Sequence, residues 1–217
     1  MAVATTTRPV LESGDRLARE EFHRRYCARP DINRAELVEG VVYVVSPLRF
    51  DLHAEPHAGA VTWLGTYAAT TPGVRLGDNA TVYLDAENEV QPDAILWREE
   101  AGGPLITPDH YIEGSPQLVV EVAASSASYD LHDKLEAYRR NGVREYVVWR
   151  VLDEAIDWFR LYEGEYVRVE PDARGVIESE AFPGLRLDVA KLVAGDLAGV
   201  LAELEPRPSE GQPERQV

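Results

Sequence analysis

Three ionisable side chains in the middle of the chain have the types and spacing that hydrolytic chemistry requires. Asp93 follows Pro92 on a predicted strand, Glu121 lies within the next buried strand, and Lys134 comes one turn after Asp130 on the helix that follows. Two carboxylates on neighbouring strands can hold one or two hard cations, because Mg²⁺ binds through a few carboxylates and keeps several waters. A nearby ammonium can orient the attacking water and offset the charge that develops on a pentavalent phosphate. The three groups therefore predict metal-assisted phosphodiester hydrolysis.

The strand around Glu121 is otherwise aliphatic, with the sequence LVVEV at 118–122. Such a run is typical of a strand that is buried on both faces. A buried and unpaired carboxylate costs several kcal/mol, so we expect Glu121 to meet a metal or a basic partner, or to point into a wet cleft. The alternative is an exposed glutamate on a half-buried strand.

Composition indicates one globular domain. The chain has 217 residues, of which 45% are hydrophobic and 28% are charged, enough for one full core. We expect a flexible leader at 1–13, a single domain at 14–204 and a disordered, acidic and proline-rich tail at 205–217. The net charge of -16 argues against a general nucleic-acid coat, although it allows a local basic face.

The cysteine and hydropathy patterns bear on the compartment. Cys27 is the single cysteine, which excludes an internal disulfide and a multi-thiolate zinc site. This usage fits a reducing cytoplasm. The sequence has no apolar run of membrane-spanning length and no basic-then-apolar leader. We therefore expect a soluble, cytoplasmic protein with no membrane partner.

Hydrophobic periodicity predicts a mixed α/β (α+β) protein in which helices and antiparallel hairpins flank a central sheet. We predict helices at 15–30, 53–70, 130–140 and 189–204, and hairpins at 35–45 and 156–169. Further strands are predicted at 74–76, 81–84, 90–97, 118–123 and 144–150, with a turn at 124–128 and a polar loop at 99–116. The two carboxylate-bearing strands and the lysine-bearing helix are consecutive major elements of this core.

Several motifs together resemble one known family. They are QPD at 91–93, LVVEV at 118–122 with serines at 125 and 126, and the series Asp130, Lys134, Tyr138, Gly142, Val143, Glu145 and Tyr146. Others are ELVEG at 36–40, SP at 46–47 before a helix that begins with histidine, and FPGL at 182–185. The chain resembles, over about 17–204, the Uma-two type of restriction endonuclease in the PD-(D/E)xK nuclease superfamily. The set is far more specific than any one motif alone.

This resemblance implies a restriction-endonuclease-like fold with a mixed central sheet and helices on its faces. It implies a DNA endonuclease that uses Mg²⁺ or Mn²⁺, with Asp93 and Glu121 as metal ligands. The superfamily lysine two residues after the strand glutamate is absent, since that position is Ala123. Lys134 on the helix is the matching residue in this family. A homodimer with paired sites is a further implication.

The resemblance carries over more weakly to Glu36, Asp130 and Tyr138 as rim or orienting groups. His57 is a candidate for the phosphate-binding rim, and the sequence leaves open whether His53 or His57 faces the site. The structural alternatives are a core aromatic for Tyr138 and a helix N-cap for Asp130.

Other chemistry at these and neighbouring residues is less well supported. His53 and His57 have the spacing of zinc ligands on a helix, but they lack the order of a metalloprotease motif. His23 and Cys27 share that spacing, and a surface histidine with a buried thiol is the better interpretation. A nucleophile formed by Ser125 or Ser126 with His132 and Asp130 lacks a nucleophile elbow.

The sequence therefore supports a metal-dependent DNA endonuclease, with two alternatives. One is a catalytically inactive nuclease fold that binds DNA or protein. The other is a hydrolase of small nucleotides, which predicts a closed pocket. Trp97, Trp149 and Trp158 would mark a dimer interface if they were exposed, although burial in the core is the expectation for each.

Overall fold

A mixed six-stranded sheet forms the centre of the molecule, in the order β12-β11-β10-β9-β6-β3. The computed structural model describes residues 9–45, 49–100, 102–124 and 126–204. The strands are β12 (Glu165–Arg168), β11 (Ala155–Tyr162), β10 (Glu145–Arg150), β9 (Leu118–Ala123), β6 (Ala94–Arg98) and β3 (Val74–Asp78). β9 and β10 run parallel, and the other neighbouring pairs are antiparallel. The predicted mixed α/β class is confirmed.

A second six-stranded sheet lies beside the first, in the order β2-β1-β5-β4-β8-β7. Its strands are β2 (Val41–Val44), β1 (Ala35–Val38), β5 (Glu89–Val90), β4 (Val82–Tyr83), β8 (Ile112–Glu113) and β7 (Leu105–Ile106). The predicted hairpin at 35–45 is confirmed as β1 and β2, and its turn has positive φ at Glu39 and Gly40. A small hairpin pairs β13 (Val176–Glu178) with β14 (Arg186–Asp188).

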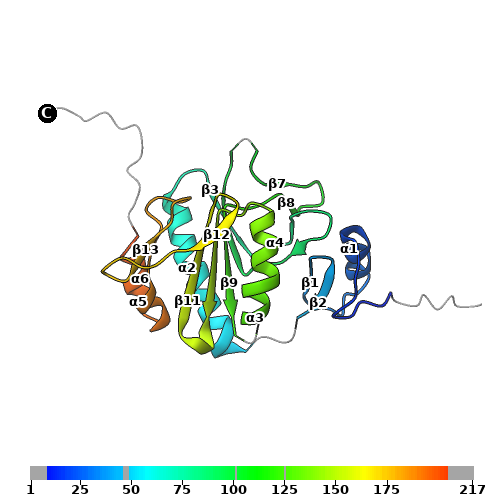
Figure 1. Cartoon of the computed structure of the whole chain (residues 1–217), viewed down its shortest axis with the longest axis horizontal. Helices are drawn as coiled ribbons and strands as arrows, with labels where there is room; N and C mark the ends of the chain where they lie inside the picture. The colour runs from blue at the N-terminus through cyan, green and yellow to red at the C-terminus, as the bar shows by residue number, and fades with distance from the viewer. Residues whose placement is uncertain (1–8, 46–48, 101, 125, 205–217) are drawn as a thin grey trace, which may run out of the picture.

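Helices cover both faces of the central sheet (Figure 1). α2 (Glu55–Thr70) packs on one face through Trp63, Leu64 and Tyr67, and α4 (Leu135–Arg140) packs on the other through Ala137 and Tyr138. The remaining helical segments are α1 (Arg19–Cys27), η1 (Phe50–Ala54), α3 (Ala127–Tyr129), η2 (Asp130–Lys134), η3 (Val151–Asp153), α5 (Val189–Val193) and α6 (Leu197–Leu201). α3, η2 and α4 follow one another without a break and carry the predicted helix at 130–140.

The side chains of strand β9 alternate between the two faces of the central sheet. Leu118, Val120 and Val122 belong to the core under α2, whereas Val119 and Ala123 belong to the core under α4. This alternation follows from the two-residue period of a strand. It places Glu121 on the face of the sheet that α4 covers.

The predicted strand at 90–97 is wrong as a single element. β5 ends at Val90 and belongs to the second sheet, whereas β6 begins at Ala94 and belongs to the central sheet. The three residues between them, QPD, include a proline that cannot donate to a strand ladder. The QPD segment therefore carries the chain from one sheet to the other.

Other predicted boundaries also change. The first helix begins at Arg19, not at 15, because Asp15 and Leu17 hydrogen-bond the hairpin of β1 and β2 instead. The predicted helix at 189–204 is two short helices, α5 and α6, separated at Gly195, whose φ is +74°. The turn predicted at 124–128 is cut short by α3, and the loop predicted at 99–116 contains β7 and β8.

Trp97, Trp149 and Trp158 are buried, as expected for core residues, so they mark no exposed interface on this chain. Within the described ranges, every helix is too short or too polar to cross a bilayer. Residues 1–8 of the predicted leader at 1–13, and the whole predicted tail at 205–217, lie outside the described residues.

Replacing Leu96 on β6 by alanine should lower the free energy of unfolding by about 2–5 kcal/mol, because Leu96 is fully buried under α2 and its truncation leaves a cavity. Urea denaturation measures this change. The matched control is Leu105→Ala, since Leu105 is 69% exposed and should change stability by about 0.5 kcal/mol or less. Equal effects of the two substitutions would show that the packing of β6 is misassigned.

Candidate active site

Pairing between β6 and β9 brings Asp93 next to Glu121. Ala94 lies opposite Val120 in this antiparallel pair, so the residues one step further along, Asp93 and Glu121, also face each other. The backbone N–H of Val122 donates to Oδ2 of Asp93 at 2.8 Å. Two carboxylates that are 28 positions apart in sequence therefore meet at one edge of the sheet.

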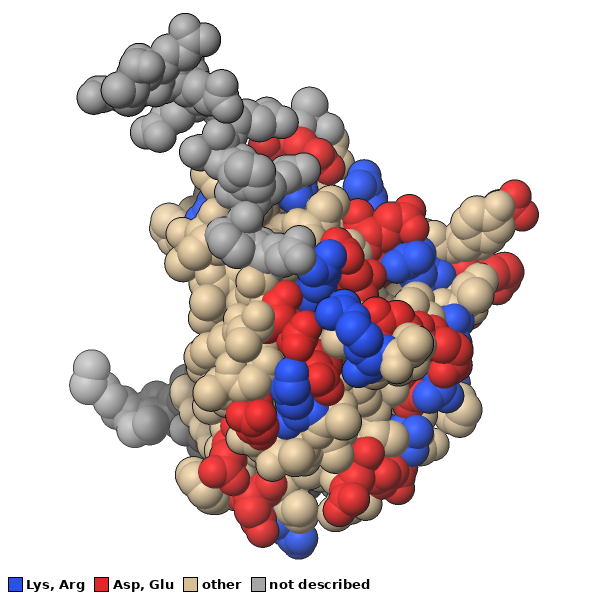
Figure 2. All heavy atoms as spheres, turned by 90° about the vertical axis from the view of Figure 1, so that its left-hand side faces the viewer, with Lys and Arg blue, Asp and Glu red and all other residues tan. Residues whose placement is uncertain are grey.

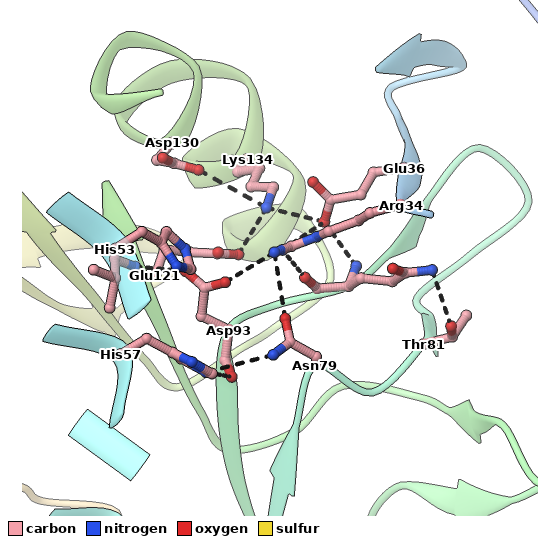
Figure 3. A network of polar contacts seen from close by, with 12 residues as sticks. Arg34, Glu36, His53, His57, Asn79, Thr81, Asp93, Glu121, Asp130 and Lys134 are labelled. Carbon is pink, nitrogen blue, oxygen red and sulfur yellow. Dashed lines mark hydrogen bonds and ion pairs between the residues drawn. The ribbon is translucent and has the colours of Figure 1, made fainter. Parts of the chain in front are cut away.

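Asp93 is held by two further side chains (Figure 3). Arg34, just ahead of β1, contacts Oδ1 at 3.0 Å, and Nε2 of His53 on η1 lies 3.2 Å from Oδ2. Burial alone would raise the pKa of Asp93, but the hydrogen bond from His53 and the charge of Arg34 outweigh it and hold this pKa well below its usual range. Asp93 is therefore a carboxylate at neutral pH.

Lys134 connects the other acidic groups. Its Nζ lies 2.8 Å from Oε1 of Glu121, 3.0 Å from Oε1 of Glu36 and 3.8 Å from Oδ1 of Asp130. The lysine is 2% exposed. Burial would lower its pKa, but the charges of Glu121, Glu36 and Asp130 raise it instead. Lys134 is thus a buried ammonium surrounded by carboxylates.

Glu121 has the buried basic partner that its sequence context required, and the alternative of an exposed glutamate is wrong because Glu121 is 2% exposed. Tyr138 on α4 also donates to Oε1 of Glu121, at 2.9 Å. Burial raises the pKa of Glu121, and the ammonium of Lys134 opposes this rise only in part because Asp93, Asp130 and Glu36 are close. The site therefore holds a carboxyl group that retains a proton more readily than an isolated glutamate.

Glu36, Asp130 and Tyr138 all contact this network. Glu36 on β1 accepts from the backbone N–H of Gln91 at 2.7 Å, which links the second sheet to the QPD segment. Asp130 lies within η2 and is not the helix N-cap, because α3 begins ahead of it at Ala127. Tyr138 is fully buried as a core aromatic and also bonds to Glu121 through its hydroxyl.

The two histidines of the second predicted helix reach different atoms. His53 contacts the carboxylate of Asp93, whereas Nε2 of His57 lies 3.0 Å from the main-chain carbonyl of Asp93 and 3.0 Å from Oδ1 of Asp78. Only His53 of the two lines the pocket described below. Among the described residues, no three His, Cys, Asp or Glu side chains converge on a metal position, so the zinc alternative lacks a ligand set.

A pocket of about 510 Å³ opens onto this network. Its polar lining comes from the acidic and basic groups already described and from Arg49, Ser126 and Tyr129. Three buried atoms on its wall have no hydrogen-bond partner among the described residues: Nε of Arg34, Nδ1 of His53 and the hydroxyl of Tyr129. Buried polar atoms are normally satisfied, so these three atoms are left for water or a polar ligand to satisfy.

Sequence reasoning did not assign roles to Arg34, Arg49 or Tyr129. A signal existed for Arg34, because it stands two residues before Glu36 and residues two apart lie on the same face of a strand. Tyr129 gave no comparable signal, since an aromatic before a helix is usually a core residue. The proposed serine nucleophile gains no support: Ser125 lies outside the described residues, and Ser126 hydrogen-bonds Asp130 directly.

The donor atoms present suit a hard divalent cation. Asp93 and Glu121 offer carboxylate oxygens side by side, and Mg²⁺ is often bound by two carboxylates with water in its other positions. Four buried carboxylates (Asp93, Glu121, Glu36 and Asp130) surround two permanent cations, Arg34 and Lys134. Burial raises the pKa of Glu121 and of Asp130, so a divalent cation at this site would compete with protons on these carboxyl groups.

Comparisons with known proteins identify a family and a similar fold. Residues 19–190 match the model of the family Uma2, described as "Putative restriction endonuclease". A solved structure, a putative nuclease belonging to DUF820 from Anabaena variabilis, is similar with a TM-score of 0.55 and 14% sequence identity. That match covers 73% of this chain and 90% of the other. The search of curated proteins returned no match.

The family match supports a nuclease-like function, and the chain belongs to the Uma2 family. The resemblance inferred from the motifs is therefore confirmed, and so is the mixed sheet flanked by helices.

Replacing Glu121 by glutamine should make stability less dependent on pH. The pKa of Glu121 is raised in the native protein. Between about pH 4.3, the ordinary pKa of a glutamate in the unfolded chain, and this raised pKa, the native protein therefore binds more protons than the unfolded protein. Wild-type stability falls as pH rises through this range. The glutamine variant lacks this loss, so its free energy of unfolding relative to wild type should rise by about 1 kcal/mol or more between pH 5 and pH 8.

Urea denaturation at the two pH values measures this change. Glu170→Gln is the matched control, since the Glu170 side chain is 74% exposed. Parallel pH profiles for wild type and Glu121→Gln would contradict the raised pKa.

Proposed function

We propose that this protein is a divalent-metal-dependent endonuclease that hydrolyses phosphodiester bonds in DNA. The observation that carries the proposal is the position of Lys134 at the end of η2, where its ammonium lies 2.8 Å from Glu121 on β9. Asp93 and Glu121 would hold Mg²⁺ or Mn²⁺. When bound, the ion would polarise a phosphoryl oxygen and make a water a better nucleophile.

Lys134 has two tasks in this scheme. Hydrolysis requires a water to attack phosphorus while the ester P–O bond breaks, and negative charge grows on the phosphoryl oxygens as this happens. A buried ammonium at the pocket wall stabilises that charge and can hold the attacking water by a hydrogen bond. The carboxylates of Glu36 and Asp130 keep Lys134 protonated, since they raise its pKa. Tyr138 fixes the orientation of Glu121 by donating a hydrogen bond to Oε1.

Unpaired donors on the pocket wall support a phosphate ligand. Nε of Arg34 and the hydroxyl of Tyr129 are both buried without a partner among the described residues. Both groups donate hydrogen bonds, and Arg34 also carries a permanent charge. A non-bridging phosphate oxygen would satisfy both requirements. Arg49 lines the same pocket and offers a further positive group for the DNA backbone.

The distribution of surface charge limits where DNA would bind. On the side of the molecule that carries α5 and α6, Lys and Arg are interspersed with Asp and Glu (Figure 2). Phosphate binding depends on clustered Lys and Arg, so that mixed face is a poor DNA surface. The side that opens onto Arg34 and Arg49 is the better candidate. A small contact surface fits an acidic chain whose net charge is -16.

One observation favours a second candidate, a catalytically inactive module of the same fold. Arg34 already pairs with Oδ1 of Asp93, and among the described residues no three-ligand metal group is formed. If Arg34 stays paired with Asp93 when metal ions are available, its positive charge takes the place of a metal ion at this carboxylate. Such a module would bind DNA or protein without requiring the carboxylates of Asp93 and Glu121.

Replacing Lys134 by methionine should reduce cleavage of DNA in Mn²⁺ by about 10²-fold or more, because the group that stabilises the developing charge is lost. Gel analysis of a plasmid substrate measures the rate. Lys191→Met is the matched control, since Lys191 is the only other lysine and pairs on the surface with Asp188 and Glu203. Circular dichroism checks folding of each variant. Equal cleavage by wild type and Lys134→Met would end the proposed role.

Metal binding separates the two candidates. Calorimetric titration with Mn²⁺ should give a site in the wild type that is lost in Asp93→Asn, because the substitution removes a charged ligand. Asp109→Asn, at an exposed position, should bind like the wild type. If Asp93→Asn loses neither Mn²⁺ binding nor cleavage, Asp93 is not a ligand. DNA binding without any Mn²⁺ binding by the wild type would favour the inactive module.

A further inference from the structure

A second polar cluster lies at α1, on the other side of β1 and β5 from the pocket of Lys134. Sγ of Cys27 lies 3.3 Å from Nε2 of His23, and Nδ1 of the same histidine lies 2.9 Å from Oε1 of Glu89. The interpretation of Cys27 as a buried thiol is wrong, because the residue is exposed. The three groups form a chain from thiol to imidazole to carboxylate. A nucleophile, its base and the group that orients the base have this order in enzymes.

The histidine ring is fixed in this position. Its side chain is 28% exposed, and it packs edge-on against the rings of Tyr83 and Tyr111, with centroids 5.6 Å and 5.2 Å away. The Tyr83 hydroxyl also lies 3.2 Å from Nδ1 and 3.4 Å from Nε2. When Nδ1 carries the ring proton and donates it to Glu89, the lone pair of Nε2 is free to face the thiol of Cys27. The geometry is thus compatible with a tautomer that can accept the thiol proton.

Glu89 supplies an independent sign that this cluster has a ligand. Its side chain is 1% exposed, it lines a pocket of about 300 Å³ beside Cys27, and its Oε2 has no hydrogen-bond partner among the described residues. Burial raises the pKa of Glu89, and the hydrogen bond from His23 opposes that rise. A positive charge on His23 would stabilise the ionised carboxyl further. Transfer of the thiol proton to His23 creates that charge.

A metal ion does not explain this cluster. The two nitrogens of His23 face different partners, so Cys27 and Glu89 cannot share one ion through that ring. Among the described residues, no group of three such ligands is formed. The arrangement suits proton transfer rather than coordination.

We propose that Cys27 is a nucleophilic site that takes small disulfides from solution, with His23 as its base and Glu89 as the positioning residue. The Cys27 proton passes to Nε2 of His23 while sulfur attacks one sulfur of the disulfide. The new S–S bond joins Cys27 to half of the ligand, and the old S–S bond breaks. The departing thiolate takes the proton back from His23. Cys27 is oxidised, and the leaving half is reduced to a thiol.

The pocket adds a binding preference to this reactivity. Arg29 lines it beside Cys27, with its guanidinium held by Asp31 at 2.9 Å. Tyr111 lines the same pocket as Cys27. Disulfides that carry amide and carboxylate groups, such as oxidised glutathione, match this polar lining.

The test is the rate at which the metal-free, DNA-free full chain forms an adduct with oxidised glutathione, followed by intact mass. Because Cys27 is the single cysteine, any adduct reports on this residue. The wild type should react at least about tenfold faster than His23→Gln, because the general base is lost, and Glu89→Gln should be slowed as well. His110→Gln, at an exposed position, is the matched control and should react like the wild type.

Two results would overturn the proposal. One is an adduct rate for His23→Gln equal to that of the wild type. The other is a wild-type rate no faster than that of the same chain in denaturant, which reports an unassisted thiol. Circular dichroism confirms that the variants are folded, and Tyr111→Phe, which keeps the base and the carboxylate, should retain most of the rate. Neither measurement depends on cleavage of DNA.

Discussion

The arrangement of the candidate active site depends on one buried ammonium group. Lys134 contacts Glu121, Glu36 and Asp130, which come from β9, β1 and η2. Its charge is the common counter-ion for three carboxylates that would otherwise repel one another in a low-dielectric interior. Removing it would leave several buried charges without compensation. The same contacts join the central sheet, the second sheet and the helix on one face.

The QPD segment connects this electrostatic centre to the architecture. Its backbone leaves the second sheet at Val90 and enters the central sheet at Ala94, so Asp93 lies where the two sheets meet. Gln91 bonds to Glu36 on β1 and accepts from Arg34 through its carbonyl. The proline that prevents a continuous strand thereby places a carboxylate beside Glu121. A regular strand across this position would keep Asp93 within one sheet.

The site combines an excess of carboxylates with unpaired donors on the pocket wall. Arg34, His53 and Tyr129 line the pocket, and each has a buried polar atom without a partner among the described residues. The carboxylates favour a cation and the donors favour an anion. A divalent ion together with a phosphate would satisfy both sets of groups. This complementarity agrees with the membership of the chain in the Uma2 family.

The sequence by itself determined the mixed α/β class, the hairpin of β1 and β2, and the need of Glu121 for a basic partner. Each follows from a local signal: the hydrophobic period, the turn residues, and a charge within an aliphatic strand, respectively. It also indicated Asp93, Glu121 and Lys134 as a set.

Only the tertiary structure decided that Arg34 and His53 hold Asp93, that His57 reaches its main chain instead, and that Tyr129 lines the pocket. These contacts join residues tens of positions apart, and strand register and helix packing fix them. The division of 90–97 between two sheets also depends on tertiary contacts. The pairing of short strands is determined by packing against residues that are distant in sequence.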